Sequence, residues 1–69
     1  MLRLVVDANI PAAQEAFSAF GEVRLLPGRE ITRAHLLDAD VLLVRSVTRV
    51  NAALLDGTPV RFVGTATAG

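Results

Sequence analysis

Four short hydrophobic segments recur along the chain, and polar or amphipathic stretches separate them. The segments cover residues 2–6, 23–26, 41–44 and 60–63. Short apolar runs that are rich in Val and Leu and bounded by polar residues, Gly or Pro indicate β-strands. The third segment reads VLLV, and an unbroken apolar run of this length is typical of a parallel strand covered on both faces.

The stretch between the first two predicted strands has the features of a helix. Asn9 is placed to cap it, and Pro11 falls in its first turn, where a missing N–H is tolerated. Gly21 is expected at the left-handed position that ends the helix. One face of this helix carries apolar residues at helical spacing, namely Ala13, Ala16, Phe17 and Phe20.

Two shorter helical segments are expected further along the chain. Thr32 is placed to cap the first of them, with Ile31 and Leu36 as a hydrophobic staple. Asn51 caps a second turn or short helix, which Gly57 ends. Each segment therefore connects two consecutive strands.

The alternation of strands and helices predicts an α/β fold with right-handed parallel crossovers. The expected arrangement is an incomplete flavodoxin-like, doubly wound parallel sheet of about four strands in the order 2-1-3-4. In such sheets ligands bind beyond the carboxyl ends of the strands, so residues 7–11, 45–49 and 65–69 would share one rim. The sequence offers no helix after the fourth strand, and we therefore expect one sheet face to expose apolar area.

Composition restricts the classes of partner. The 69 residues make at most one small domain, and 52% of them are hydrophobic. Seven acidic and seven basic residues leave no net charge, which disfavours nucleic-acid binding because that needs a basic face. The chain has no Cys, and its first apolar run is too short for a signal peptide or a membrane span. We expect a soluble cytoplasmic unit that binds neither nucleic acid nor membrane.

Two polar loops follow the third and fourth predicted strands. The first contains Arg45, Ser46 and Thr48, and the second, residues 64–69, consists of Gly, Thr and Ala. Hydroxyls, backbone N–H groups and a guanidinium suit a carboxylate or phosphate. Alternatively, the hydroxyls satisfy local backbone groups and the second loop is a plain chain end. The second loop matches neither a phosphate-binding P-loop nor a dinucleotide fingerprint.

The end of the first strand allows a second chemical interpretation. Asp7 and Asn9 resemble the opening of PIN-type metal-dependent nucleases, which need several carboxylates around a divalent cation. Asp38 and Asp40 are the other candidate ligands, but they more simply lead into the third strand. We therefore expect no metal site. His35 has no partner nearby in the sequence and is expected at or near the surface rather than as a general base.

Four stretches of the chain match one enzyme family. They read LVVDANIP (residues 4–11), LPGR (26–29), VRSVTRVN (44–51) and GTPVRFVGTATAG (57–69). Together they resemble the erythronate-4-phosphate dehydrogenases, a group within the D-isomer-specific 2-hydroxyacid dehydrogenase family. The resemblance covers the whole chain, with a mild departure at Asp7-Ala8-Asn9 from the more usual acidic-Asn version.

This resemblance implies that residues 1–69 form the N-terminal part of a substrate-binding domain, and that an NAD-binding Rossmann domain lies outside the chain. It implies an NAD-dependent oxidation of 4-phospho-D-erythronate to 3-hydroxy-2-oxo-4-phosphooxybutanoate, in pyridoxine 5'-phosphate biosynthesis. Ser46 and Thr67 would bind the phosphorylated substrate, with Arg45 as an anion partner. The family's catalytic Arg, Glu and His would lie beyond Gly69. The chain alone would then be inactive, and the whole enzyme would be a homodimer.

Two alternatives stay open. A phosphoglycerate dehydrogenase, or another D-2-hydroxyacid dehydrogenase, would keep the fold and the chemistry but change the substrate. A non-catalytic α/β interaction module would keep the fold alone. The downstream sequence would discriminate between enzyme and module, because a catalytic parent must encode the glycine-rich NAD loop and the catalytic residues.

Overall fold

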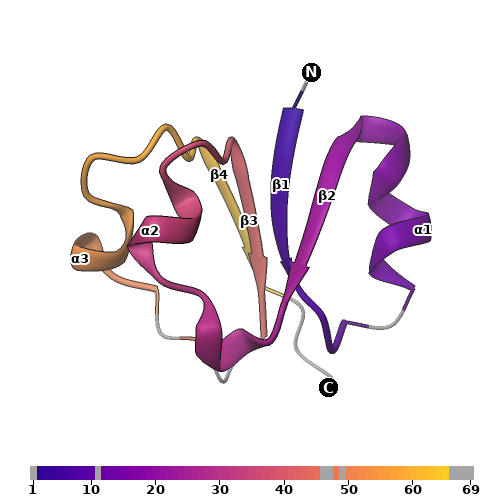
Figure 1. Cartoon of the computed structure of the whole chain (residues 1–69), viewed down its shortest axis with the longest axis horizontal. Coiled ribbons are helices and arrows are strands. Elements are labelled where there is room, and N and C mark those ends of the chain that lie inside the picture. Colours follow the sequence, from indigo (N-terminus) through magenta and orange to yellow (C-terminus); the bar gives the residue numbers. More distant parts are fainter. Residues whose placement is uncertain (1, 11, 46–47, 49, 66–69) are drawn as a thin grey trace.

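A computed structural model describes residues 2–10, 12–45, 48 and 50–65. Its centre is a single sheet of four parallel strands in the order β2-β1-β3-β4, as Figure 1 shows. Both the all-parallel pairing and the strand order confirm the sequence prediction of an incomplete flavodoxin-like sheet. The strands are β1 (Leu2–Asp7), β2 (Gly21–Leu26), β3 (Val41–Val44) and β4 (Phe62–Thr65).

Short helices connect the strands and divide between the two faces of the sheet. Helix α1 (Ala13–Phe17), extended by a 3-10 turn over Ser18–Phe20, lies on one face, and α2 (Arg33–Leu36) and α3 (Ala52–Leu55) lie on the other (Figure 1). A second 3-10 turn, Gly28–Glu30, follows β2. Within the described residues, no helix has the length and apolar character needed to cross a membrane.

The face under α2 and α3 holds the main core. Consecutive strand residues point to opposite faces, and Val5 of β1 and Leu42 and Val44 of β3, which point to this side, are buried. The core joins strand, helix and connecting segments because the apolar face of α2 packs across β1 and β3. Its buried members are Val5, Ile31, Leu36, Ala39, Leu42 and Val44.

The face under α1 is only partly covered. Leu4 and Val6 are buried there, with Phe17 packed against them. Phe62 on β4, however, is 59% exposed, and Phe20 is 63% exposed. Both rings line an open apolar groove with a volume of about 310 Å³. The expectation that one sheet face exposes apolar area is therefore confirmed for the described part of the chain.

The segment that connects β1 to β2 differs from its prediction at both ends. Asn9 does not cap α1, because the helix begins only at Ala13; Asn9 lies instead in a turn directly after β1, where its N–H donates to Asp7 Oδ1 at 2.8 Å. The N-cap is Ala12, whose side chain cannot cap a helix. Gly21 does not end the helix in the left-handed region but begins β2, opposite Leu2. A Cβ at Gly21 would collide with the Leu2 carbonyl oxygen, so close strand pairing requires glycine here.

The predicted apolar face of the first helix is also narrower than expected. Phe17 packs on the sheet, but Ala16 and Phe20 are exposed. The reason is that the α-helix ends after five residues and continues as a 3-10 turn. The tighter winding of a 3-10 turn breaks the 3.6-residue periodicity on which the prediction depended.

The later elements agree more closely with the sequence. Asn51 Oδ1 accepts the Leu54 N–H at 2.9 Å and caps α3 as predicted. At the start of α2, the Thr32 N–H donates to His35 Nδ1 at 3.2 Å, which gives the half-buried His35 a capping contact that the sequence did not suggest. Strand β4 begins at Phe62 rather than Val60. Val60 instead packs against the core under α2 and α3.

Candidate functional site

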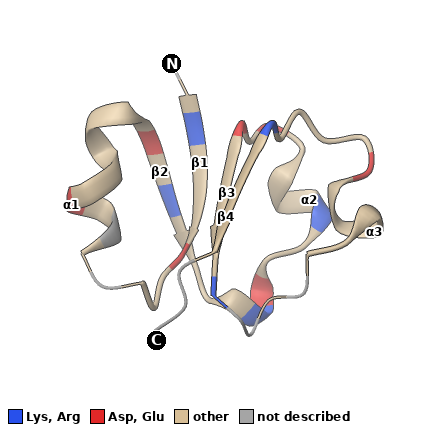
Figure 2. Ribbon diagram, turned by 180° about the vertical axis from the view of Figure 1, so that it is seen from behind, with Lys and Arg blue, Asp and Glu red and all other residues tan. Residues whose placement is uncertain are grey.

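The carboxyl ends of the four strands form one edge of the molecule. Because the order is β2-β1-β3-β4, the residues that end β1 and β3 are neighbours. An acidic position lies at that end of β1 and a basic one at that end of β3 (Figure 2). The sequence predicted this shared rim, and the described residues confirm it for Asp7, Arg45 and Thr65.

Asp7 and Arg45 form an ion pair at this rim. Arg45 Nε donates to Asp7 Oδ2 at 3.2 Å. The Asp7 side chain is 0% exposed, whereas that of Arg45 is 36% exposed. A buried carboxylate requires partners, and Asp7 has them in the guanidinium of Arg45 and the N–H of Asn9. The pair therefore has a covered acidic side and a basic side open to solvent.

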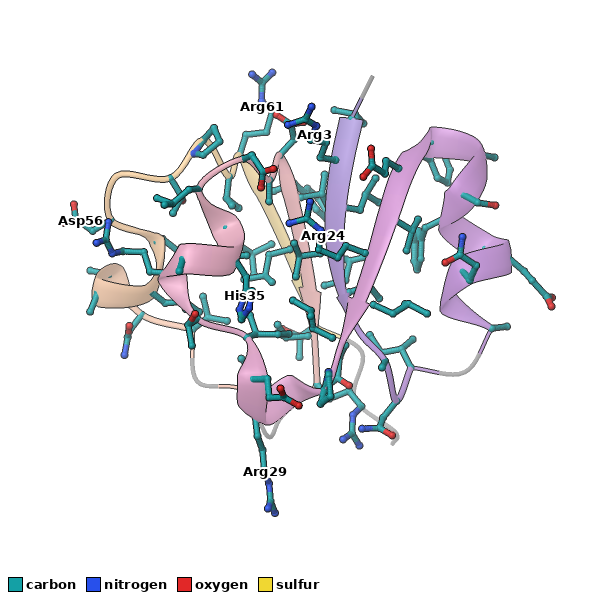
Figure 3. All side chains as sticks on the ribbon, in the orientation of Figure 1. Arg3, Arg24, Arg29, His35, Asp56 and Arg61 are labelled. Carbon is teal, nitrogen blue, oxygen red and sulfur yellow. The ribbon has the colours of Figure 1, made fainter. Side chains whose placement is uncertain are left out.

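The open side of Arg45 borders a polar pocket of about 370 Å³. Arg29, in the 3-10 turn after β2, also contributes to its wall, although its side chain extends away from the sheet (Figure 3). The Thr48 Oγ1 donates to the Gly28 carbonyl at 3.1 Å and ties the loop after β3 to this turn. The lining residues are Asn9, Pro27, Gly28, Arg29, Glu30 and Arg45.

Two of the three predicted substrate-binding residues lie outside the described residues. These are Ser46 and Thr67. Ser46 directly follows Arg45, and Thr67 follows the end of β4 at Thr65. Because β3 and β4 are hydrogen-bonded neighbours, the two loops begin side by side.

The carboxylates proposed for a metal site do not converge. Asp38 and Asp40 lie before β3, at the amino end of the sheet, where Asp40 Oδ2 accepts the Arg3 N–H at 2.9 Å. Asp38 pairs with Arg3 and Arg24 at 3.4 and 3.5 Å. Asp7 is at the opposite end of β1, so these three carboxylates do not form the divalent-metal site that the nuclease alternative requires. Among the described residues, no group of three possible metal ligands occurs.

Sequence reasoning missed two features of this site. It interpreted Asp7 as a loop residue rather than as the partner of Arg45, and it did not place Pro27–Glu30 beside the rim. The predicted strand order contained a usable signal for the first, since β1 and β3 were expected to be neighbours with opposite charges at their ends. The second depends on the β1–β2 register, in which Asp7 is opposite Leu26.

Sequence comparisons show the relationship of the chain to known proteins. No family model matches it. It is 65% identical over 68 residues to erythronate-4-phosphate dehydrogenase of Azotobacter vinelandii, 62% identical to that of Salinibacter ruber and 59% identical to that of Escherichia fergusonii. Each match covers 99% of this chain but only 17% or 18% of the relative, so the chain spans less than a fifth of their length. The chain is therefore similar over nearly its whole length to the N-terminal part of the erythronate-4-phosphate dehydrogenases.

Proposed function

We propose that this chain is the N-terminal part of the substrate-binding domain of an NAD-dependent dehydrogenase. The parent enzyme oxidises the 2-hydroxyl of 4-phospho-D-erythronate to the 2-oxo acid, as a step in pyridoxine 5'-phosphate biosynthesis in the cytoplasm. The observation that carries this proposal is the 65% identity to the Azotobacter vinelandii dehydrogenase over 99% of the chain. The three relatives named above are all erythronate-4-phosphate dehydrogenases, which favours this substrate over the phosphoglycerate alternative.

The role proposed for this chain is to bind and orient an acidic substrate. Ser46, Thr67 and Arg45 are the proposed contacts, with hydroxyls and a guanidinium as donors to a carboxylate or phosphate. Support comes from the position of Arg45 at the carboxyl ends of the strands, where α/β sheets bind ligands, and from the pocket beside it. Orientation alone contributes strongly to a reaction that needs near-attack geometry.

The described residues do not fit NAD. A dinucleotide site of this type needs a glycine-rich turn between a strand and a helix whose N-terminus faces the pyrophosphate. After β1 the chain instead has Asp7 and Asn9 in a tight turn, and α1 has only five residues. We therefore assign NAD binding, together with the catalytic Arg, Glu and His, to the part of the parent enzyme outside this chain.

The remainder of the parent enzyme is also the partner proposed for the exposed apolar face. Phe62, Phe20 and Leu2 line one groove on this face and are each at least 39% exposed, and an apolar face of this kind is typical of a surface that another segment covers. On this proposal the whole enzyme is a homodimer, and the isolated chain binds substrate weakly and has no turnover.

A chimera tests this proposal. Residues 1–69 would replace the matching segment of the Azotobacter vinelandii relative, and NADH formation from 4-phospho-D-erythronate would be compared with that from 3-phosphoglycerate. We expect turnover of the first acid by the chimera and none by the isolated chain. A folded chimera without activity, or an active isolated chain, would contradict the proposal.

Replacing Arg45 by Ala in this chimera tests the binding role directly. Loss of a charge-assisted hydrogen bond should raise KM by roughly tenfold or more. Arg61→Ala is the matched control, since Arg61 is an exposed arginine at the opposite end of the sheet (Figure 3), and its removal should leave KM unchanged. Equal KM values for the two variants would argue against Arg45 as a substrate contact.

A further inference from the structure

Asp7 is a buried carboxylate for which the proposed reaction has no direct use. It is 0% exposed and engages both oxygens, with Oδ1 accepting the Asn9 N–H at 2.8 Å and Oδ2 accepting Arg45 Nε at 3.2 Å. A buried charge is retained at a cost in desolvation unless its partners compensate it. The contacts of Asp7 therefore indicate that its role is to act on Arg45.

The nitrogen that Asp7 engages determines which part of Arg45 is presented to the pocket. A guanidinium carries five N–H donors in a planar fork. Within the described residues, Nε is the nitrogen through which Arg45 bonds. Engagement of Nε leaves the two Nη groups, whose parallel donors match the oxygens of a carboxylate or phosphate. Arg45 is partly exposed and lines the polar pocket.

Backbone hydrogen bonds hold Asp7 and its carboxylate in place. Asp7 ends β1 in register with Leu26, and the next residue, Ala8, donates its N–H to the Leu26 carbonyl at 2.8 Å. The Asn9 N–H then fixes Oδ1. The carboxylate is thus on a rigid strand end, whereas Arg45 follows its strand with a long, rotatable side chain. Of the two partners, Asp7 is the fixed one.

From these contacts we infer that Asp7 is a positioning residue: it holds Arg45 through Nε so that the Nη groups meet an oxyanion of the substrate in the pocket. This inference depends on the proposed function, in which Arg45 contacts substrate. It predicts that removing the charge of Asp7 raises KM, whereas the loss of a negative charge would by itself lower KM for an anionic substrate. Removing a negative charge next to the pocket would by itself strengthen anion binding, whereas releasing the guanidinium weakens it because its side chain must be ordered at each binding event.

The test is a double-mutant cycle in the same chimera. Asp7→Asn keeps the shape of the side chain and removes its charge. We expect this change to raise KM for 4-phospho-D-erythronate about three- to tenfold with little change in kcat, the range expected for immobilising one flexible side chain. In the Arg45→Ala background, Asp7→Asn should not raise KM, because the residue that Asp7 positions is gone and only the loss of a negative charge beside the pocket remains. Asp38→Asn is the matched control, since it removes an aspartate that pairs with arginines at the opposite end of the sheet.

Several results would overturn the inference. An unchanged or lowered KM in Asp7→Asn would mean that orientation of Arg45 is unimportant, and an equal rise in the Arg45→Ala background would mean that Asp7 acts independently of it. If Asp7→Asn only destabilises the protein, apparent kcat falls with the folded fraction while KM stays constant, which also counts against the inference. If Arg45→Ala itself leaves KM unchanged, the proposed substrate site fails and the inference falls with it.

Arg45→Lys supplies a readout that does not depend on the folding of an Asp7 variant. Lysine keeps the positive charge but lacks the planar fork, so it cannot pair with Asp7 through one edge and present two parallel donors through another. We expect KM of this variant to lie close to that of Arg45→Ala. A KM equal to that of the unmodified chimera would show that charge alone is sufficient and would contradict a positioning role.

Discussion

The two faces of the sheet are made by the same strands but differ in how fully they are covered. Leu42 and Leu43 are adjacent in β3 and point to opposite sides. Leu42 is 0% exposed in the core under α2 and α3, whereas Leu43 lines the open groove between α1 and β4. The difference arises because two connections cross one face and a single short one crosses the other. Packing is thus decided by the course of the connections rather than by the apolar character of the strand.

The largest effect on stability is expected when the side chains of these two leucines are truncated to Ala, one at a time. Leu42→Ala should lower the free energy of unfolding by about 2–5 kcal/mol, because it leaves a cavity in a closed core. Leu43→Ala should cost only about 1 kcal/mol, since its side chain is already partly hydrated. Urea unfolding of the 69-residue chain, followed by circular dichroism, measures both. Equal losses would show that the two faces are covered alike in solution.

Two glycines test whether crowding can relax at a paired strand backbone and at the open groove. At Gly21 a Cβ would meet the Leu2 backbone, which cannot move without separating β1 from β2. Gly21→Ala should therefore cost about 1–3 kcal/mol. At Gly64 a Cβ would meet Leu43 Cδ2 at 2.7 Å and Phe62 Cε1 at 3.3 Å, and both side chains border the open groove. Gly64→Ala should cost under about 1 kcal/mol. The opposite order of unfolding midpoints would refute this account.

The smallest effect on stability is expected at Phe62. Because its side chain is 59% exposed, Phe62→Ser should change the free energy of unfolding by about 0.5 kcal/mol or less. It should, however, reduce the fluorescence of a hydrophobic dye bound to the chain, since the apolar groove loses one wall. Phe20→Ser, on the other side of the groove, should behave in the same way. Strong destabilisation by either change would mean that this face is closed.

Most of the fold could be predicted because its signals are local or depend on simple topology. The four apolar segments marked the strands, and their alternation with helices implied parallel pairing and the order that is observed. Asn51 capped its helix as predicted because that contact spans only three residues. Asn9 did not, because α1 begins at Ala13 and Asn9 lies in the turn that follows β1. Where the turn ends and the helix begins depends on how the connection packs on the sheet, which the local pattern does not determine.

The candidate site was predicted in part. Arg45 was identified from its charge and its place after an apolar strand, and the structure places it at the expected rim. The roles of Ser46 and Thr67 stay predictions, since both lie outside the described residues. The partnership of Arg45 with Asp7 joins positions 38 residues apart in the sequence. It could be found only from the pairing of β1 with β3.

By itself, the sequence determined the class of fold, the strand order and the family to which the loops are similar. These properties follow from apolar periodicity and from residue types at loop positions, both of which are local. Only the tertiary structure decided that Asp7 is buried against Arg45, that the turn after β2 borders the pocket and that the half-open face is the one under α1. Each of these depends on the register between strands and on the path of a connection across the sheet, which are long-range properties of the folded chain.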